Sequence, residues 1–117
     1  MVPGTPAADA PVRGPAGEWL LRHLECGFTL LAFGPLPSDA VDALARGAVP
    51  VHVVQVDAPA AAGAIAVRDV EGLVAERYAA LPGTCYLLRP DQHVCARWRA
   101  FDADAVRAAL ARATANA

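Results

Sequence analysis

The chain has 117 residues, the length of one ordinary domain, and a net charge of −2, which provides no basic field for nucleic acid or an anionic membrane. Its longest apolar runs, residues 28–33 and 49–56, are far shorter than the ~20 residues of a membrane span, and no signal-peptide pattern opens the chain. We therefore expect a soluble, cytoplasmic protein with one core and no nucleic-acid or membrane partner.

The first elements follow a segment rich in proline, glycine and alanine. Residues 1–17 show little apolar periodicity and are expected to form an extended leader or interdomain linker, with the domain spanning residues 18–117. Residues 18–25 predict a short amphipathic helix whose apolar stripe comprises Trp19, Leu20, His23 and Leu24.

A strand, a helix and a second strand come next. Residues 28–33 are a continuous apolar run, as expected of a central strand buried on both faces. Ser38 is the expected N-cap of a helix over residues 39–46, and residues 50–56 predict another buried strand. This order favours two parallel strands joined by a right-handed crossover.

The rest of the chain predicts helix, hairpin and helix. Residues 57–67 carry little pattern, and Asp69 is the expected cap of a helix over residues 70–81. After the hairpin, Asp102 is the expected cap of a helix over residues 103–115. The predicted order is helix, β, α, β, α, β, β, α, an α/β fold whose mixed sheet is flanked by helices.

The predicted hairpin pairs residues 84–89 with residues 94–99 in one continuous register, with Cys85 opposite Trp98. Alternation along the ladder then places Cys85 and Cys95 on opposite faces of the sheet. We therefore expect no disulfide between them.

Several kinds of chemistry lack their sequence signature. Cys26 makes the cysteine count odd, no Cys-X-X-Cys occurs, and no two glycines have the Gly-X-Gly spacing of a dinucleotide-binding loop. His23, His52 and His93 never approach a metal-ligand spacing. We predict no catalytic residue, no bound cofactor and no metal site.

The predicted order of elements resembles the thioredoxin fold. In redox-active members of that fold, the loop after the first central strand carries Cys-X-X-Cys, and a cis-proline precedes the hairpin. Here the loop is FGPLPS, residues 33–38, and Thr84 stands near the proline position. The resemblance therefore implies a redox-inert member.

Within that fold, LLRPDQHVCARW (residues 87–98) closely resembles the last hairpin of one group, although Gln92 stands where a glycine is common. This group is the C-terminal thioredoxin-like domain of FAD-dependent aromatic hydroxylases, including 3-(3-hydroxyphenyl)propionate, phenol and polyketide hydroxylases. The resemblance implies a parent enzyme that uses FAD and NAD(P)H, bound by its other domains. It also implies a non-catalytic role for this chain, as a structural, interdomain or dimer-contact module.

The candidate interface is on the hairpin. Arg89, Arg97 and Arg99 are expected to clamp a carboxylate or a neighbouring domain, or else to form a solvated edge, and Trp98 to anchor an interface or pack in the core. Asp91 is expected to bind the amides of its own turn. Two rival functions stay open: a stand-alone peroxiredoxin-like or atypical thioredoxin-like protein using a single cysteine, and an adaptor that binds peptides along a sheet edge.

Overall fold

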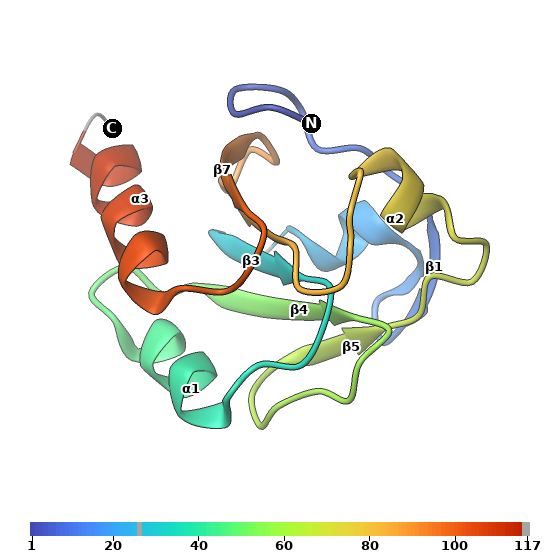
Figure 1. The fold of residues 1–117 in the computed structure, drawn as a ribbon, viewed down its shortest axis with the longest axis horizontal. Coiled ribbons are helices and arrows are strands. Elements are labelled where there is room, and N and C mark those ends of the chain that lie inside the picture. Colours follow the sequence, from blue (N-terminus) through green and yellow to red (C-terminus); the bar gives the residue numbers. More distant parts are fainter. Residues whose placement is uncertain (26, 116–117) are drawn as a thin grey trace.

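The computed structural model describes residues 1–25 and 27–115 (Figure 1). In these residues no helix has the length and apolar character needed to cross a membrane. The elements in chain order are β1 (Pro11–Gly14), β2 (Gly17–Trp19), the 3₁₀ helix η1 (Leu20–His23), β3 (Thr29–Ala32), α1 (Ser38–Arg46), β4 (His52–Val56), β5 (Ile65–Val67), α2 (Leu73–Arg77), β6 (Cys85–Leu88), β7 (Val94–Trp98) and α3 (Ala103–Ala115).

Five strands form the main sheet in the order β5-β4-β3-β6-β7. β3 is parallel to β4 and antiparallel to β6, β5 extends the parallel part, and β7 closes the hairpin with β6. All four residues of β3 are buried, which confirms the central strand predicted from the apolar run. The predicted thioredoxin-like α/β architecture is therefore confirmed.

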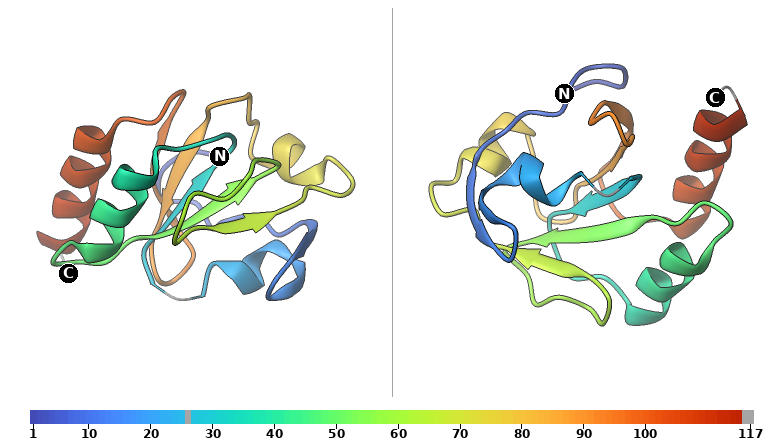
Figure 2. Two further views of the ribbon diagram at one scale, coloured as in Figure 1. Left: turned by 90° about the horizontal axis from the view of Figure 1, so that it is seen from below. Right: turned by 180° about the vertical axis from the view of Figure 1, so that it is seen from behind.

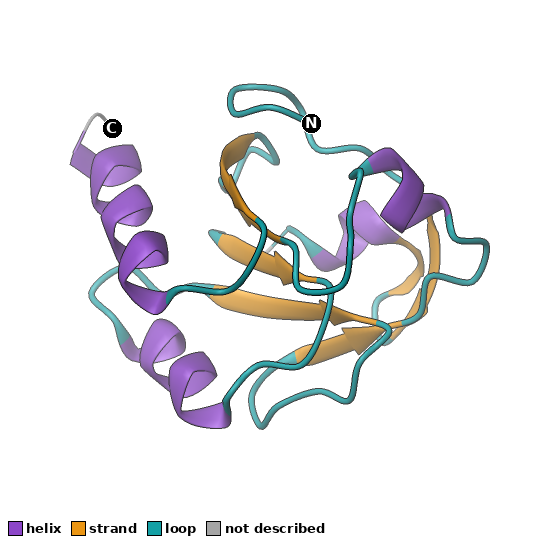
Figure 3. Cartoon of the chain, in the orientation of Figure 1, coloured by secondary structure: helices purple, strands orange, loops and turns teal. Residues whose placement is uncertain are grey.

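Helices cover the two faces of this sheet. α1 and α3 lie on one face, and η1 and α2 lie on the other (Figures 2 and 3). The buried side chains accordingly form two clusters. The α1/α3 cluster comprises Leu30, Ala32, Val41, Leu44, Val51, Val53, Cys85, Leu87, Val106 and Ala109. The η1/α2 cluster includes Val12, Leu20, Leu24, Leu31, Val54, Val67, Val74, Tyr78, Tyr86 and Leu88.

The predicted helix caps have mixed outcomes. Asp102 caps α3, because one of its carboxylate oxygens accepts the amides of Asp104 and Ala105, 3.0 and 3.2 Å away. The predicted Ser38 cap is wrong, because Pro37 occupies the N-cap position of α1 and no side chain caps that helix. The extended φ and ψ of Pro37 move the helix start one residue toward the N-terminus, so that Ser38 is already helical.

α2 is shorter than the predicted helix over residues 70–81. The predicted Asp69 cap is correct only in part: Gly72 occupies the N-cap position, while the two carboxylate oxygens of Asp69 accept the amides of Val74 and Ala75 in the first turn. Gly72, at a φ of 71°, precedes the first helical turn, and Ala79 has a φ of 47°, which is incompatible with further helix. Left-handed residues at both ends therefore restrict α2 to Leu73–Arg77.

The segment expected to be an extended leader is packed against the domain. It contributes β1, and the side chains of Ala10 and Val12 are buried. Nearer the N-terminus, Gly4 and Ala7 donate backbone hydrogen bonds to the carbonyls of Val94 and Gln92. Backbone pairing of this kind needs no apolar periodicity, and therefore the composition of residues 1–17 did not reveal it.

Residues 18–25 also differ from the prediction. They form the end of β2 and the short η1, and of the expected apolar stripe Leu20, His23 and Leu24 are buried. Trp19 instead has 51% of its surface exposed. β5, in a stretch that carried little pattern, was missed altogether, because a three-residue strand is too short for a detectable period.

The β6–β7 hairpin contains an irregularity that the sequence did not predict. Cys85 pairs with Trp98 as expected, but the register shifts between Leu87 and Leu88, so that Leu88 pairs with Val94. The extra residue in β7 interrupts the alternation of faces. Both Cys85 and Cys95 therefore contact the α1/α3 cluster, and the prediction of opposite faces is wrong. Both thiols are free.

Gly14 lies against the core in a way that excludes a larger residue. A Cβ at Gly14 would lie 2.5 Å from Nε2 of His23 and 2.7 Å from Cγ1 of Val67. The ring of His23 cannot easily move away, because Nδ1 is hydrogen-bonded to the carbonyl of Trp19 and Nε2 accepts the amide of Ala16. We expect Gly14→Ala to lower the free energy of unfolding by about 1 to 3 kcal/mol.

Urea denaturation measures this difference, and Gly47→Ala is the matched control. Gly47 has a φ of −64°, and a Cβ there would meet its nearest atom at 3.6 Å. Equal effects of the two substitutions would contradict the packing described for Gly14.

Candidate functional site

The carboxyl ends of β3 and β4 are where an open α/β sheet most often binds ligands. A cavity of about 430 Å³ lies there, lined by residues of β4 and α2 and of the loops that follow β3, β4 and α2: Phe33, Gly34, Pro35, Val56, Asp57, Ala58, Pro59, Ala75, Ala80, Leu81 and Pro82. These residues include no cysteine, histidine or basic side chain. Asp57 is their one ionisable side chain, and its carboxylate accepts the amide of Asp69 at 3.0 Å.

The loop that leads into α1 does not fit a flavin pyrophosphate. Such a group needs several free backbone amides at a helix N-terminus. Pro35 and Pro37 have no amide hydrogen, and the amide of Ala40 is bonded to the carboxylate of Asp39. The residues described at this end of the sheet therefore include no thiol or imidazole nucleophile and do not form a dinucleotide-binding loop.

The buried side chain of Gln55 connects two loops at the same end of the sheet. Its buried amide nitrogen donates to the carbonyl of Gly34, and its amide oxygen accepts the backbone amide of Ala61. It thereby ties the loop after β3 to the loop between β4 and β5. Gln55 lies in a strand that the sequence predicts as buried. A polar residue in a buried strand needs hydrogen-bond partners, and its presence there could have indicated this contact between the two loops.

The two thiols that the structure describes are poor nucleophiles. Burial raises the pKa of Cys85 to about 11. Cys95 is half-buried beside a groove of about 680 Å³ between the hairpin and α3, and burial is also the largest cause of its raised pKa. Both thiols are protonated near neutral pH, whereas thiol catalysis needs the thiolate. Cys26 lies outside the described residues.

The tip of the hairpin is held by an ion pair within the turn. Nε and Nη2 of Arg89 donate to the two carboxylate oxygens of Asp91 at 3.0 and 2.6 Å. This contact lowers the pKa of Asp91 to about 2. Asp91 also accepts the amide of His93, as expected. Gln92 has a φ of 64°, the left-handed conformation for which a glycine is common, and its side chain donates to the carbonyl of Leu21.

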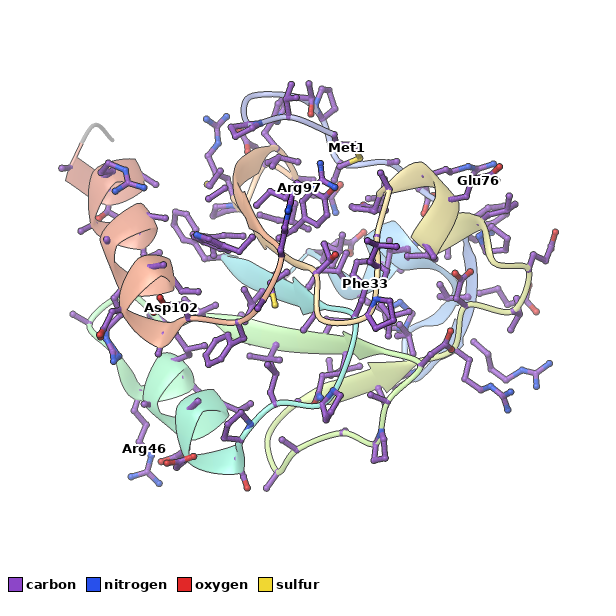
Figure 4. All side chains as sticks on the ribbon, viewed as in Figure 1. Met1, Phe33, Arg46, Glu76, Arg97 and Asp102 are labelled. Atoms are coloured by element: carbon purple, nitrogen blue, oxygen red, sulfur yellow. The ribbon has the colours of Figure 1, made fainter. Side chains whose placement is uncertain are left out.

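The candidate interface residues of the hairpin fall into different environments. Arg97, which Figure 4 labels on β7, donates to the carbonyl of Ala79 and lies 5.6 Å from the centre of the Tyr86 ring. Trp98 is half-buried against the α1/α3 cluster, and Arg99 is exposed. Arg89 and Arg97 thus have partners inside the domain, and the four residues do not form one open cluster of unpaired charges.

The residues that the structure describes contain no group of three or more His, Cys, Asp or Glu side chains that could hold an ion. His23 is buried, and both of its ring nitrogens are hydrogen-bonded to backbone atoms. Its role is to connect β2 and η1 to the turn at Ala16.

Comparison with known proteins adds two kinds of likeness. No family model and no curated protein matches the chain. Among solved structures, aklavinone-11 hydroxylase with FAD and aklavinone is 29% identical, with a TM-score of 0.69 over 92% of this chain and 20% of its own. The flavin-dependent monooxygenase PieE with FAD and substrate is also 29% identical, with a TM-score of 0.74 over 94% of this chain and 19% of its own.

A third structure, peroxidoxin BcpB from Mycobacterium tuberculosis, is 18% identical, with a TM-score of 0.65 over 98% of this chain and 97% of its own. At that identity the likeness shows the thioredoxin fold alone. The chain spans about a fifth of the length of the two hydroxylases, and the matched parts of FAD-dependent hydroxylases are C-terminal domains.

Proposed function

We propose that this chain is the redox-inert, thioredoxin-like C-terminal domain of a cytoplasmic FAD-dependent aromatic hydroxylase, and that it acts as a structural, interdomain or dimer-contact module. The observation that carries the proposal is the 29% identity to two flavin hydroxylases over more than nine-tenths of this chain. FAD, NAD(P)H and the aromatic substrate would be bound by the other domains of the parent.

The end of the sheet supports the non-catalytic part of the proposal. A thioredoxin-type reaction needs a thiolate at the helix that follows the first central strand. Here that loop carries Gly34, Pro35 and Pro37, and the described thiols lie elsewhere with raised pKa values. The fold therefore agrees with the peroxiredoxin-like alternative, but the described residues include no suitable nucleophile for it.

The reading frame that precedes codon 1 in the source genome tests the domain assignment. We expect a continuous frame of several hundred codons that contains Gly-X-Gly-X-X-Gly, the dinucleotide-binding pattern. A stop codon and a promoter directly upstream would make this chain an independent protein and would reject the proposal.

Disulfide reductase activity tests the redox-inert part. We expect insulin reduction by dithiothreitol in the presence of the chain to match the rate without it, because no Cys-X-X-Cys is available. The same assay with Cys85→Ser and Cys95→Ser provides the control. Turnover above background that either substitution abolishes would favour the single-cysteine alternative.

A further inference from the structure

The N-terminal segment, residues 1–10, pairs with the start of β7. Gly4 donates its amide to the carbonyl of Val94 at 2.7 Å, and Val94 donates its own amide to the carbonyl of Thr5 at 2.8 Å. Thr5 in turn donates its amide and its hydroxyl to the carbonyl of Val2, at 3.2 and 2.6 Å. The backbone is therefore fixed to the hairpin within a few residues of residue 1.

Side chains of the α2 region hold the next part of the same segment. Arg77 donates to the carbonyl of Asp9 at 2.6 Å, and the hydroxyl of Tyr78 donates to the carbonyl of Ala8 at 2.6 Å. The carboxylate of Asp9 accepts the amide of Leu21 at 3.0 Å. Because the N-terminal segment is held at both of these places, it is a fixed part of the domain and cannot act as a freely moving tether.

A groove of about 680 Å³ lies directly beside this pairing, between the hairpin and α3. Gly4, which the pairing fixes, is one of the residues that line it. Phe28 packs against the α1/α3 cluster and still keeps part of its surface exposed in the groove. The rest of the apolar lining comprises Pro90, Val94, Cys95, Ala109 and Ala113. An apolar lining bordered by charged residues is typical of protein interfaces, which have an apolar centre and a polar rim.

In the parent protein of the proposed function, the chain enters this domain beside the groove. The chain spans about a fifth of the length of the two hydroxylases, and the matched parts are C-terminal domains, so that most of such a parent precedes residue 1. Three residues, the separation of residue 1 from Gly4, reach at most about 11 Å. Residue 1, the tip of the hairpin and the last turn of α3 lie at the same end of the molecule (Figure 1). This short reach gives the preceding domains a high effective concentration at the groove.

We propose that the groove between the hairpin and α3 is the docking site for an apolar segment of the flavin and substrate domains in the parent hydroxylase. The inference rests on the proposed function and names the surface that the function uses. An apolar occupant suits the lining, because its burial removes apolar surface from water on both sides. Arg89, which also lines the groove, needs no acidic partner from outside, because Asp91 already binds it through two hydrogen bonds.

The groove contains only part of the interface expected from the sequence. Arg89 belongs to its lining, whereas Arg97, Trp98 and Arg99 do not. The residues that line it come instead from the N-terminal segment, the tip of the hairpin, α3 and the start of β3.

A second copy of this chain is the less favourable occupant. A symmetric dimer brings the same patch of both copies together, and here that would place one groove opposite another. Two concave surfaces leave a void between them, and atoms that line a void lose their packing contacts. A segment of the adjoining domain can instead enter the groove, and its covalent connection lowers the entropic cost of association.

The experiment compares this chain alone with the full parent protein, using amide hydrogen exchange. In the parent we expect exchange over residues 89–95 and 109–113 to slow by roughly 10-fold or more. Ala113→Glu in the parent should return residues 89–95 to the rates of the isolated chain, because docking would bury the new carboxylate under an apolar segment. The matched control is Ala108→Glu, which makes the same change at an exposed position of α3 outside the groove lining.

We expect the control to leave exchange at the groove unchanged. Thermal unfolding of each isolated variant checks that the fold is intact. A second variant leaves every residue of the domain in place: ten glycine and serine residues inserted before residue 1 of the parent. Because a longer tether lowers the effective concentration, protection over residues 89–95 should fall by several-fold.

The outcomes separate the inference from the proposed function, which the upstream reading frame tests on its own. Protection at another surface with residues 89–95 unchanged, or equal effects of Ala113→Glu and Ala108→Glu, would overturn the docking site and leave the domain assignment standing. Identical exchange in the parent and the isolated chain at every surface would reject the contact role and the docking site together. A dimer of the isolated chain that Ala113→Glu abolishes, seen by sedimentation velocity, would assign the groove to a second copy and overturn the inference.

Discussion

Replacement of Tyr78 by alanine is expected to lower the free energy of unfolding by about 3 to 5 kcal/mol. The ring of Tyr78 is fully buried, packs edge-on against Tyr86 with ring centres 5.2 Å apart, and lies 6.1 Å from the ring of Phe33. Its hydroxyl donates to the carbonyl of Ala8 at 2.6 Å. The substitution would therefore open a cavity and release the N-terminal segment at the same time. Urea denaturation of both proteins measures the loss.

Tyr78→Phe is the matched control, because it keeps the ring and removes the hydroxyl. The expected loss is about 1 to 2 kcal/mol, since the carbonyl of Ala8 loses its donor. Limited proteolysis should then cut residues 1–9 faster in both variants than in the wild type. A Tyr78→Ala protein as stable as Tyr78→Phe would show that the aromatic cluster contributes little.

Cys85 is expected to react with iodoacetamide at pH 8 more than about 100-fold more slowly in the folded protein than in urea. A thiol whose pKa is about 11 is about one-thousandth ionised at pH 8, whereas an unperturbed thiol is roughly one-quarter ionised. Burial of the sulfur adds to the effect by excluding the reagent. Mass spectrometry of the alkylated peptides separates Cys85 from Cys95, and Cys85→Ala confirms the assignment.

The same shift has a consequence for stability at high pH. The thiol of Cys85 stays protonated in the folded state up to about pH 11, while the unfolded chain loses this proton near pH 8.5. The unfolded state therefore binds fewer protons above pH 8.5, and stability falls as the pH rises toward 11. Cys85→Ala should make this part of the decline smaller. Rapid alkylation of folded Cys85 near neutral pH would support the single-cysteine alternative.

In the hairpin, one feature of the strand pairing could be predicted from the sequence and another could not. Pairing of Cys85 with Trp98 follows from alternation alone and is confirmed. The shift after Leu87 does not follow from it, because an extra residue in one strand leaves the apolar pattern nearly unchanged. The faces of Cys85 and Cys95 depended on that single residue, and their prediction was wrong.

The prediction of the candidate interface was incomplete for a similar reason, because it depended on contacts between residues that are distant in the sequence. The sequence identifies Arg89 and Arg97 as cationic and predicts a turn at Asp91, which is the partner of Arg89. It does not predict the partner of Arg97, because the carbonyl of Ala79 is 18 positions away in the chain. The groove that Arg89 lines was also not predicted, because its residues come from segments that are distant in the sequence.

By itself, the sequence determined the properties that arise from local patterning: a buried central strand at residues 28–33, the parallel strand after α1, the Asp102 cap and the absence of Cys-X-X-Cys. These depend on apolar runs, short spacings and residue types. Tertiary structure decided the packing of residues 1–17, the edge strand β5, the shifted register in β7 and the backbone bridge between Arg13 and Arg68. Each of these arises from backbone hydrogen bonds between distant segments, which any residue except proline can donate, and such bonds leave no periodic trace in the side chains.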